Sequence, residues 1–223
     1  MDIGNTLAFI VFPYIALAVF TFGHIGRYLT DRYTWNARSS EFLEKKRLFF
    51  GVTIFHWGIL LTLFGHVGGM LVPQRTLDLF GINAATHVTI AHYSGMTTGM
   101  AVLVGLGFLL YRRTAMPRMQ LLTSTNDYIT LGGVLVVSAI GLYNVFFGGY
   151  YVLDTIAPWI RGIVTFSPEP ALIAEAPLSY KAHIFSALAL LAYSPFSRLV
   201  HIWSVPLGYL LRSPLVFRQK VVE

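Results

Sequence analysis

The chain has 223 residues, of which 55% are apolar and only 12% are charged, and its mean hydropathy is +0.63. Soluble domains carry about twice that share of charged residues, so this balance indicates a membrane protein. The absence of cysteine excludes disulfides, iron–sulfur clusters, thiolate-ligated haem and Cys-rich zinc sites in this chain, and seven histidines are left as the main metal-ligand candidates. The net charge of +6 does not indicate nucleic acid, because Lys and Arg lie in short clusters between long apolar runs.

Five segments are long and apolar enough to cross a membrane as helices, which takes roughly 20 residues at about 1.5 Å each. In chain order they cover residues 6–25, 49–72, 88–111, 128–147 and 183 to about 203. The first segment follows Met-Asp instead of a basic stretch and has no small-residue cleavage site, so we expect a retained helix and not a signal peptide. No repeat or linker divides the chain. We therefore predict one all-α integral membrane domain over residues 1–223, with five transmembrane helices.

The distribution of positive charge predicts how these helices are oriented. Thirteen of the sixteen Lys and Arg residues fall on one side, which the positive-inside rule assigns to the cytoplasm. That side has Arg27, Arg32, Arg38, Lys45, Lys46, Arg47, Arg112, Arg113, Arg118, Arg198, Arg212, Arg218 and Lys220, whereas the other side has Arg75, Arg161 and Lys181. We therefore predict that the N-terminus lies outside and the C-terminus in the cytoplasm, as an odd number of spans requires.

Two regions outside the helices have a distinct composition. The longest outer connection, residues 148–180, contains Tyr150, Tyr151, Trp159, Phe166 and four prolines, which indicates a piece lying at the membrane interface and not a soluble domain. The basic inner loops and the tail, residues 207–223, suit docking of a cytoplasmic partner, although a surface facing solvent and lipid is equally allowed.

Four histidines fall within or at the ends of two predicted spans, where ionisable residues are costly and by default mark a functional site. His56 and His66 are ten residues apart on the second span, about 15 Å along a helix, with His56 toward the cytoplasm. His183 and His201 bracket the fifth span in the opposite order. Because these two spans run antiparallel, we expect His66 to meet His183 at the outer level and His56 to meet His201 at the inner level.

Two neutral imidazoles on one iron form a six-coordinate haem suited to electron transfer. A single zinc ion cannot bind residues that are separated by about 15 Å of helix. The 18-residue spacing on the fifth span, about 27 Å, requires a strong tilt, a bend at Pro195, or an unwound end at His183 or His201. Glycines on the second span leave room for a flat macrocycle or serve plain helix packing: Gly51, Gly58, Gly65, Gly68 and Gly69. The residues alone allow two interpretations. Either the histidines bind two haems, or they are polar residues whose hydrogen bonds are satisfied within the protein or that face a cavity.

Four stretches also carry a family resemblance: residues 32–40 (RYTWNARSS), residues 55–60 (FHWGIL), Gly65-His66 followed by Gly69-Met70-Leu71, and residues 194–206 (SPFSRLVHIWSVP). They resemble the gamma subunit of bacterial respiratory nitrate reductase, and the similarity covers essentially the whole chain, including both histidine spacings. The resemblance implies a dihaem cytochrome b in the prokaryotic cytoplasmic (inner) membrane. It places the outer haem b iron on His66 and His183, and the inner haem b iron on His56 and His201.

The resemblance further implies an enzyme subunit that oxidises quinol, such as menaquinol, near the outer haem and passes electrons inward. A cytoplasmic iron–sulfur beta subunit then relays them to a molybdenum-containing alpha subunit that reduces nitrate. The quinol-binding candidates are Gly65, His66 and His87. In the family a Lys at the entry to the third helix is associated with this pocket, whereas this chain has Thr86-His87 there. Either His87 takes that role or the pocket is built differently, and His87 and His92 are otherwise interfacial polar residues.

Two other functions stay open. A cytochrome b subunit of another quinol-linked reductase, acting on sulfur compounds or heterodisulfides, would differ only in its cytoplasmic partner. A proton or ion transporter with a histidine relay belongs to a different class and predicts no chromophore. Such transporters more often have acidic residues in mid-span, whereas Asp and Glu here lie outside the five predicted cores.

Overall fold

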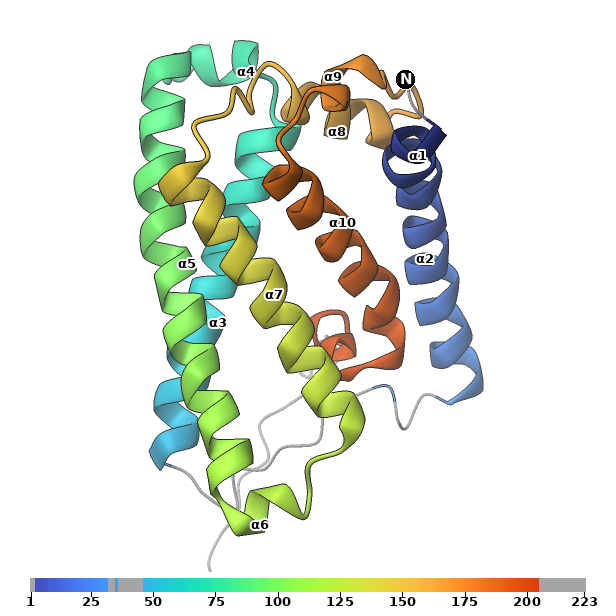
Figure 1. Cartoon of the computed structure of the whole chain (residues 1–223), viewed down its shortest axis with the longest axis vertical. Coiled ribbons are helices and arrows are strands. Elements are labelled where there is room, and N and C mark those ends of the chain that lie inside the picture. The colour runs from blue at the N-terminus through green and yellow to red at the C-terminus, as the bar shows by residue number, and fades with distance from the viewer. Residues whose placement is uncertain (1–2, 32–34, 36–45, 205–223) are drawn as a thin grey trace, which may run out of the picture.

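A computed structural model describes residues 3–31, 35 and 46–204, and the elements of this described part are all helical (Figure 1). Four helical stretches in it are long and apolar enough to cross a membrane: Ile3–Thr30, Phe49–Leu71, Ala84–Ala115 and Thr125–Phe147. They coincide with the first four predicted spans. The all-helical prediction is thus confirmed, and four of the five predicted spans have the required length and composition.

The fifth predicted span differs from the structure. Helix α10 (Leu178–Tyr193) starts five residues before the predicted span and ends well short of residue 203. Two 3₁₀ turns follow it, η3 (Ser194–Phe196) and η4 (Arg198–Ile202). Pro195 has no amide hydrogen to continue a helical ladder, so the regular helix stops there. With 16 residues, about 24 Å long, α10 is shorter than the roughly 20 residues of a full span.

The long helices pack side by side in an order that differs from their order in the chain. Helix α3 packs on α5, α5 on α7, α7 on α10, and α10 on α2. Their bounds are α2 (Phe12–Thr30), α3 (Lys46–His66), α5 (Ala84–Ala115) and α7 (Thr125–Phe147). A Cβ on Gly58 would lie 2.8 Å from the backbone nitrogen of Val102, and one on Gly105 would lie 2.5 Å from that of Phe55. Small residues therefore let α3 and α5 approach closely, as is common between membrane helices.

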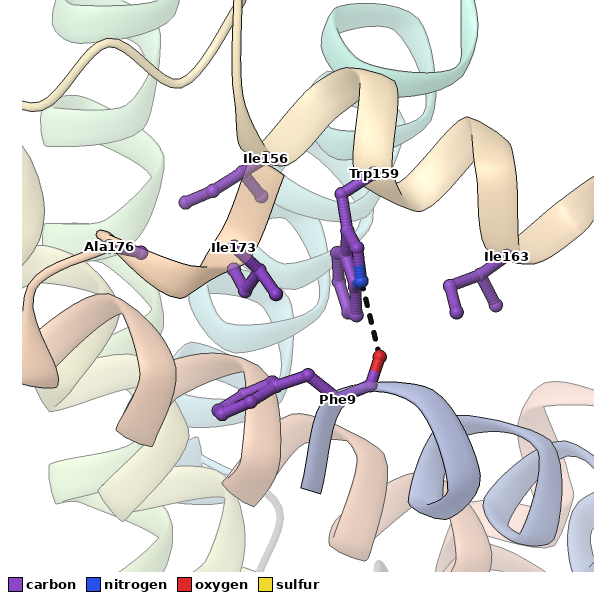
Figure 2. Packing of buried hydrophobic residues seen from close by; sticks show 6 residues of the cluster. All are labelled: Phe9, Ile156, Trp159, Ile163, Ile173 and Ala176. Carbon is purple, nitrogen blue, oxygen red and sulfur yellow. Dashed lines mark hydrogen bonds between the residues drawn. The ribbon is translucent and has the colours of Figure 1, made fainter. Parts of the chain in front are cut away.

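Short helices cover the end of the bundle where the chain begins (Figure 1). They are α1 (Ile3–Thr6), α4 (Gln74–Asp78), α8 (Ile156–Val164) and α9 (Ala171–Ala174), whereas α6 (Pro117–Gln120) lies at the opposite end. Six buried residues form one cluster there (Figure 2): Phe9, Ile156, Trp159, Ile163, Ile173 and Ala176. The indole Nε1 of Trp159 donates to the carbonyl oxygen of Phe9 at 3.1 Å, within the π-helical turn η1 (Leu7–Val11). The connection predicted to lie at the interface therefore packs onto the first helix.

Replacing Trp159 by Ala is expected to lower the free energy of unfolding by about 3–5 kcal/mol, because a fully buried indole and its hydrogen bond are both lost. Unfolding of the purified protein in detergent, followed by circular dichroism, measures this loss. Trp57, which is 64% exposed, provides the matched control, and its replacement by Ala should cost far less. Equal losses in the two variants would contradict a stabilising role for the cluster.

Several predicted features lie outside the described residues. They include most of the loop with the RYTWNARSS stretch, its basic residues up to Lys45, and the tail at residues 207–223. The prediction that these segments dock a cytoplasmic partner stays a prediction.

Candidate functional site

The four predicted ligand histidines lie in two pairs between α3 and the C-terminal part of the described chain. His66, the last residue of α3, faces His183 of α10 with ring centroids 6.1 Å apart and ring planes at 33°. His56 of α3 faces His201 of η4 with centroids 5.8 Å apart and planes at 65°. Two imidazoles that each bind one metal ion at about 2 Å through Nε2 have centroids about 6 Å apart. Both separations therefore suit two axial ligands of one iron.

The turn after α10 explains how an 18-residue spacing matches a ten-residue one. From His183 to Tyr193, α10 covers ten residues and about 15 Å, the same rise as between the two histidines of α3. The chain then turns at Ser194 and Pro195, and the 3₁₀ turns place His201 beside His56. The sequence allowed three explanations for the 18-residue spacing, and the structure mainly has one of them, the bend at Pro195.

Each of the four rings donates a hydrogen bond from Nδ1 to a backbone carbonyl oxygen. The acceptors are Val52 for His56 (2.8 Å), Thr62 for His66 (2.8 Å), Val137 for His183 (3.0 Å) and Arg198 for His201 (2.6 Å). A carbonyl oxygen cannot donate, so the proton of each neutral ring is on Nδ1 and the lone pair is on Nε2. Metal-bound histidines typically have this arrangement, in which the second nitrogen fixes the ring orientation and its basicity. All four histidines thus offer Nε2 as a ligand.

Each pair brings two imidazoles together, and within the described residues no group of three or more His, Cys, Asp or Glu converges. Haem provides four nitrogens of its own, so two imidazoles complete its iron. The donor set therefore fits haem.

Glycines make room around the outer pair. A Cβ on Gly141 of α7 would lie only 2.7 Å from Cε1 of His183, so a larger residue there would displace the imidazole. Notional Cβ atoms on Gly65 and Gly68 have no neighbour within 4 Å, which leaves open space beside His66. In contrast, Gly51 packs against α5, as Gly58 does. The glycines of α3 and of the turn that follows it thus divide between the two roles that the sequence allowed.

The backbone just beyond His66 is fixed by the cover of short helices. His66 leads directly into the π-helical turn η2 (Val67–Leu71), a kind of turn that is frequent at functional sites. Arg161 of α8 donates from Nη1 to the carbonyl oxygen of Met70 in this turn at 2.8 Å. The backbone next to the His66–His183 pair is therefore tied to α8 at the end of the bundle where the chain begins.

His87, a predicted quinol-binding residue, lies in the first turn of α5 and is 7% exposed. Its Nδ1 donates to Oε1 of Gln74 at 2.9 Å. The amide nitrogen of Gln74 donates to Asp78 Oδ1 and to the Ile82 carbonyl, each at 2.8 Å, which fixes which end of the amide is the acceptor. The Nε2 of a neutral His87 ring is therefore an unprotonated acceptor.

His87 also lies close to the turn that follows His66. A Cβ on Gly69, three residues after His66, would lie 3.3 Å from Nε2 of His87. His92 is exposed, and a regular helix places it about 140° around α5 from His87. The structure therefore brings His87 and Gly69 together and leaves His92 apart.

Two buried polar residues that contact the segment after α10 had no role in the sequence analysis. His24 of α2 accepts a hydrogen bond from Trp35 Nε1 at its Nδ1 (3.1 Å), and its Nε2 lies 3.4 Å from Ser194 Oγ, so it links α2 to the turn after α10. Asp127 of α7 pairs with two arginines. The Ser124-Thr-Asn-Asp127 stretch before an apolar run is a helix-start signal that locates Asp127, but neither its burial nor its partners.

The sequence as a whole matches known proteins. The family model for the nitrate reductase gamma subunit matches residues 5–220. The nitrate reductase gamma chain of Bacillus subtilis is 39% identical over 94% of this chain and 96% of its own length. The respiratory nitrate reductase 1 gamma chain of Escherichia coli is 32% identical over 99% of this chain and 100% of its own length. An Hdr-like menaquinol oxidoreductase cytochrome b-like subunit of Archaeoglobus profundus is 24% identical over 74% of this chain and 50% of its own length.

The breadth of these matches, together with the four long apolar helices, identifies a multi-pass membrane subunit of an oxidoreductase. The chain belongs to the nitrate reductase gamma subunit family.

Proposed function

We propose that this chain is the membrane-anchoring dihaem cytochrome b subunit of a respiratory nitrate reductase. His66 and His183 would hold the outer haem b, and His56 and His201 the inner haem b. The observation that carries this proposal is the pair of facing histidine sites, with centroids 6.1 and 5.8 Å apart and Nδ1 bonded to a carbonyl in every ring. Membership of the gamma subunit family supports it.

Bound at these sites, haem would supply one-electron transfer between a quinol at the outer end and an acceptor at the inner end. The chain itself fixes the geometry of both sites. Helix α3 holds His56 and His66 at two levels about 15 Å apart, and carbonyl hydrogen bonds set the orientation of each ring. The two imidazoles of each pair would leave a bound haem iron no open position for substrate, so both sites would serve electron transfer. Quinol protons released outside and electrons delivered inside would together move charge across the membrane.

The topology and partners follow from the same proposal. The N-terminus lies outside the prokaryotic cytoplasmic (inner) membrane, and α10 with its 3₁₀ turns completes a fifth crossing that ends in the cytoplasm. The iron–sulfur beta subunit and the molybdenum-containing alpha subunit bind on that cytoplasmic side. The excess of positive charge on the predicted inner side and the names of the gamma-chain relatives support this arrangement.

Quinol, in the form of menaquinol or a related molecule, would bind beside the outer pair at Gly65, His66 and His87. The open space at Gly65 would give room for a ring, and Nε2 of His87 would accept a quinol proton while Gln74 holds the other nitrogen. The Archaeoglobus relative, whose name includes menaquinol oxidoreductase, supports a quinol as the electron donor.

Replacing His87 by Leu is expected to slow quinol oxidation by about 100-fold, the usual size of a lost proton acceptor. The b-type absorption spectrum and nitrate reduction by an artificial reductant should stay unchanged, because neither needs the quinol pocket. The matched control is His92→Leu on the exposed side of the same helix. Normal quinol oxidation in His87→Leu would place the pocket elsewhere.

The choice of terminal acceptor is tested on the intact complex. We expect the chain to copurify with iron–sulfur and molybdenum subunits and to couple quinol oxidation to nitrate reduction. Another quinol-linked reductase would bring different partners and leave nitrate unreduced. A histidine-relay transporter would show no b-type absorption.

A further inference from the structure

The carboxylate of Asp127 joins three segments of the chain near the inner histidine pair. It accepts the backbone N–H of Ser124 at 3.0 Å in a capping box that starts α7. Its Oδ2 lies 3.3 Å from Nη1 of Arg113, near the end of α5, and its Oδ1 lies 3.0 Å from Nη1 of Arg198, in η4. Asp127 is only 6% exposed.

Helix capping alone does not account for this burial. A capping-box acid can remain in solvent, whereas a buried carboxylate with guanidinium partners loses hydration that the ion pairs must compensate. Of the two partners, Arg198 belongs to the short turn that carries His201. Through its contact with Arg198, the buried carboxylate therefore acts on the turn that holds His201.

Arg198 links Asp127 to the inner pair through its own main chain. Its guanidinium binds Asp127, and its carbonyl oxygen accepts the Nδ1 hydrogen of His201 at 2.6 Å. The preceding residues are held in the same way, because Asn126 donates from Nδ2 to the Phe196 carbonyl at 2.8 Å. Adjacent residues in the first turn of α7 thus anchor the segment that precedes His201.

We propose that Asp127 is a positioning residue for the inner haem ligand. Through Arg198, its carboxylate fixes the carbonyl that orients the His201 imidazole and sets the basicity of Nε2. Groups that hold the second nitrogen of a metal-bound histidine control the ligand in this way. This inference rests on the proposed function, because it assigns His201 to the inner haem.

The test compares three variants of the complete, haem-loaded complex in membranes. Asp127→Asn removes the carboxylate charge, Arg198→Met removes the guanidinium but keeps the carbonyl, and Asp154→Asn is the same chemical change at an exposed residue of the outer connection. The low-spin ferric electron paramagnetic resonance (EPR) signal of each haem depends on the angle between its two imidazole planes. Redox titration of each b-type component gives its midpoint potential independently.

We expect Asp127→Asn and Arg198→Met to move the inner-haem EPR signal in the same direction, with the outer-haem signal unchanged and Asp154→Asn identical to the parent. A pure charge effect is different, because losing a negative charge raises the midpoint potential and losing a positive charge lowers it. Opposite potential shifts with unmoved EPR signals would overturn the inference.

Other outcomes also decide the question. An inner haem unaltered in Asp127→Asn, or an equal loss of both haems in Asp127→Asn and Arg198→Met, would show that Asp127 has no specific influence on His201. Selective loss of the inner haem in these two variants would support it. A parent protein without two b-type components would instead overturn the proposed function before any variant is compared.

Discussion

Replacing His66 by Ala is expected to remove the outer b-type component, leave the inner one, and abolish quinol oxidation. The reason is that His183 would then face no second imidazole, while His56 and His201 keep each other at 5.8 Å and retain their carbonyl partners. Redox titration of the b-type absorbance should show one wave in place of two. Complete loss of one component is expected because the loss of a metal ligand is among the most damaging single substitutions.

The companion variant should give the opposite pattern. In His56→Ala we expect the inner component to disappear and the outer one to stay, because His66 and His183 form a separate pair 6.1 Å apart. His92→Ala, an exposed histidine, should keep both components. If both components vanished in each ligand variant, the assignment of two independent sites would be wrong.

Replacing Gly141 by Ala is expected to eliminate or strongly deplete the outer haem although no ligand is changed. The added methyl group would lie 2.7 Å from Cε1 and 3.2 Å from Nδ1 of His183. The ring cannot shift without losing its bond to the Val137 carbonyl or its position opposite His66. The haem-to-protein ratio and the outer-haem EPR signal measure the effect.

Gly132, on the same helix, provides a matched control. Its notional Cβ has no neighbour within 4 Å, so Gly132→Ala adds a methyl group without a clash. Alanine stabilises a helix by about 1 kcal/mol relative to glycine, so neither variant weakens α7 through helix propensity. Full outer-haem content in Gly141→Ala would show that His183 is not confined by α7.

Hydropathy and charge predicted the features that depend on local sequence, namely the long helices and the order in which they run. The four long spans follow from runs of apolar residues, and the antiparallel order of the second and fifth segments predicted which histidines would meet. The same pattern could not locate the end of α10. A bend at Pro195 was one of three alternatives that the histidine spacing allowed, and the direction of the chain after it depends on hydrogen bonds from Arg27 of α2 and Asn126 of α7 to this turn.

Two of the hydrogen bonds that orient the site could not be predicted from the sequence because they join different helices. His183 finds its carbonyl partner 46 residues away on α7, and Gln74 reaches His87 from another helix. The sequence around Trp159 does not show whether its indole lies at the membrane interface or is buried against Phe9, as it is in the structure. Such contacts depend on tertiary packing, whereas apolar periodicity reports only on the element that contains it.

The haem content of the unmodified protein tests the central claim most directly. Purified protein should contain two b-type haems per chain, measured as the pyridine haemochrome, and its redox titration should resolve two components. One haem per chain, or none, would contradict the assignment of His56, His66, His183 and His201 as two pairs of axial ligands.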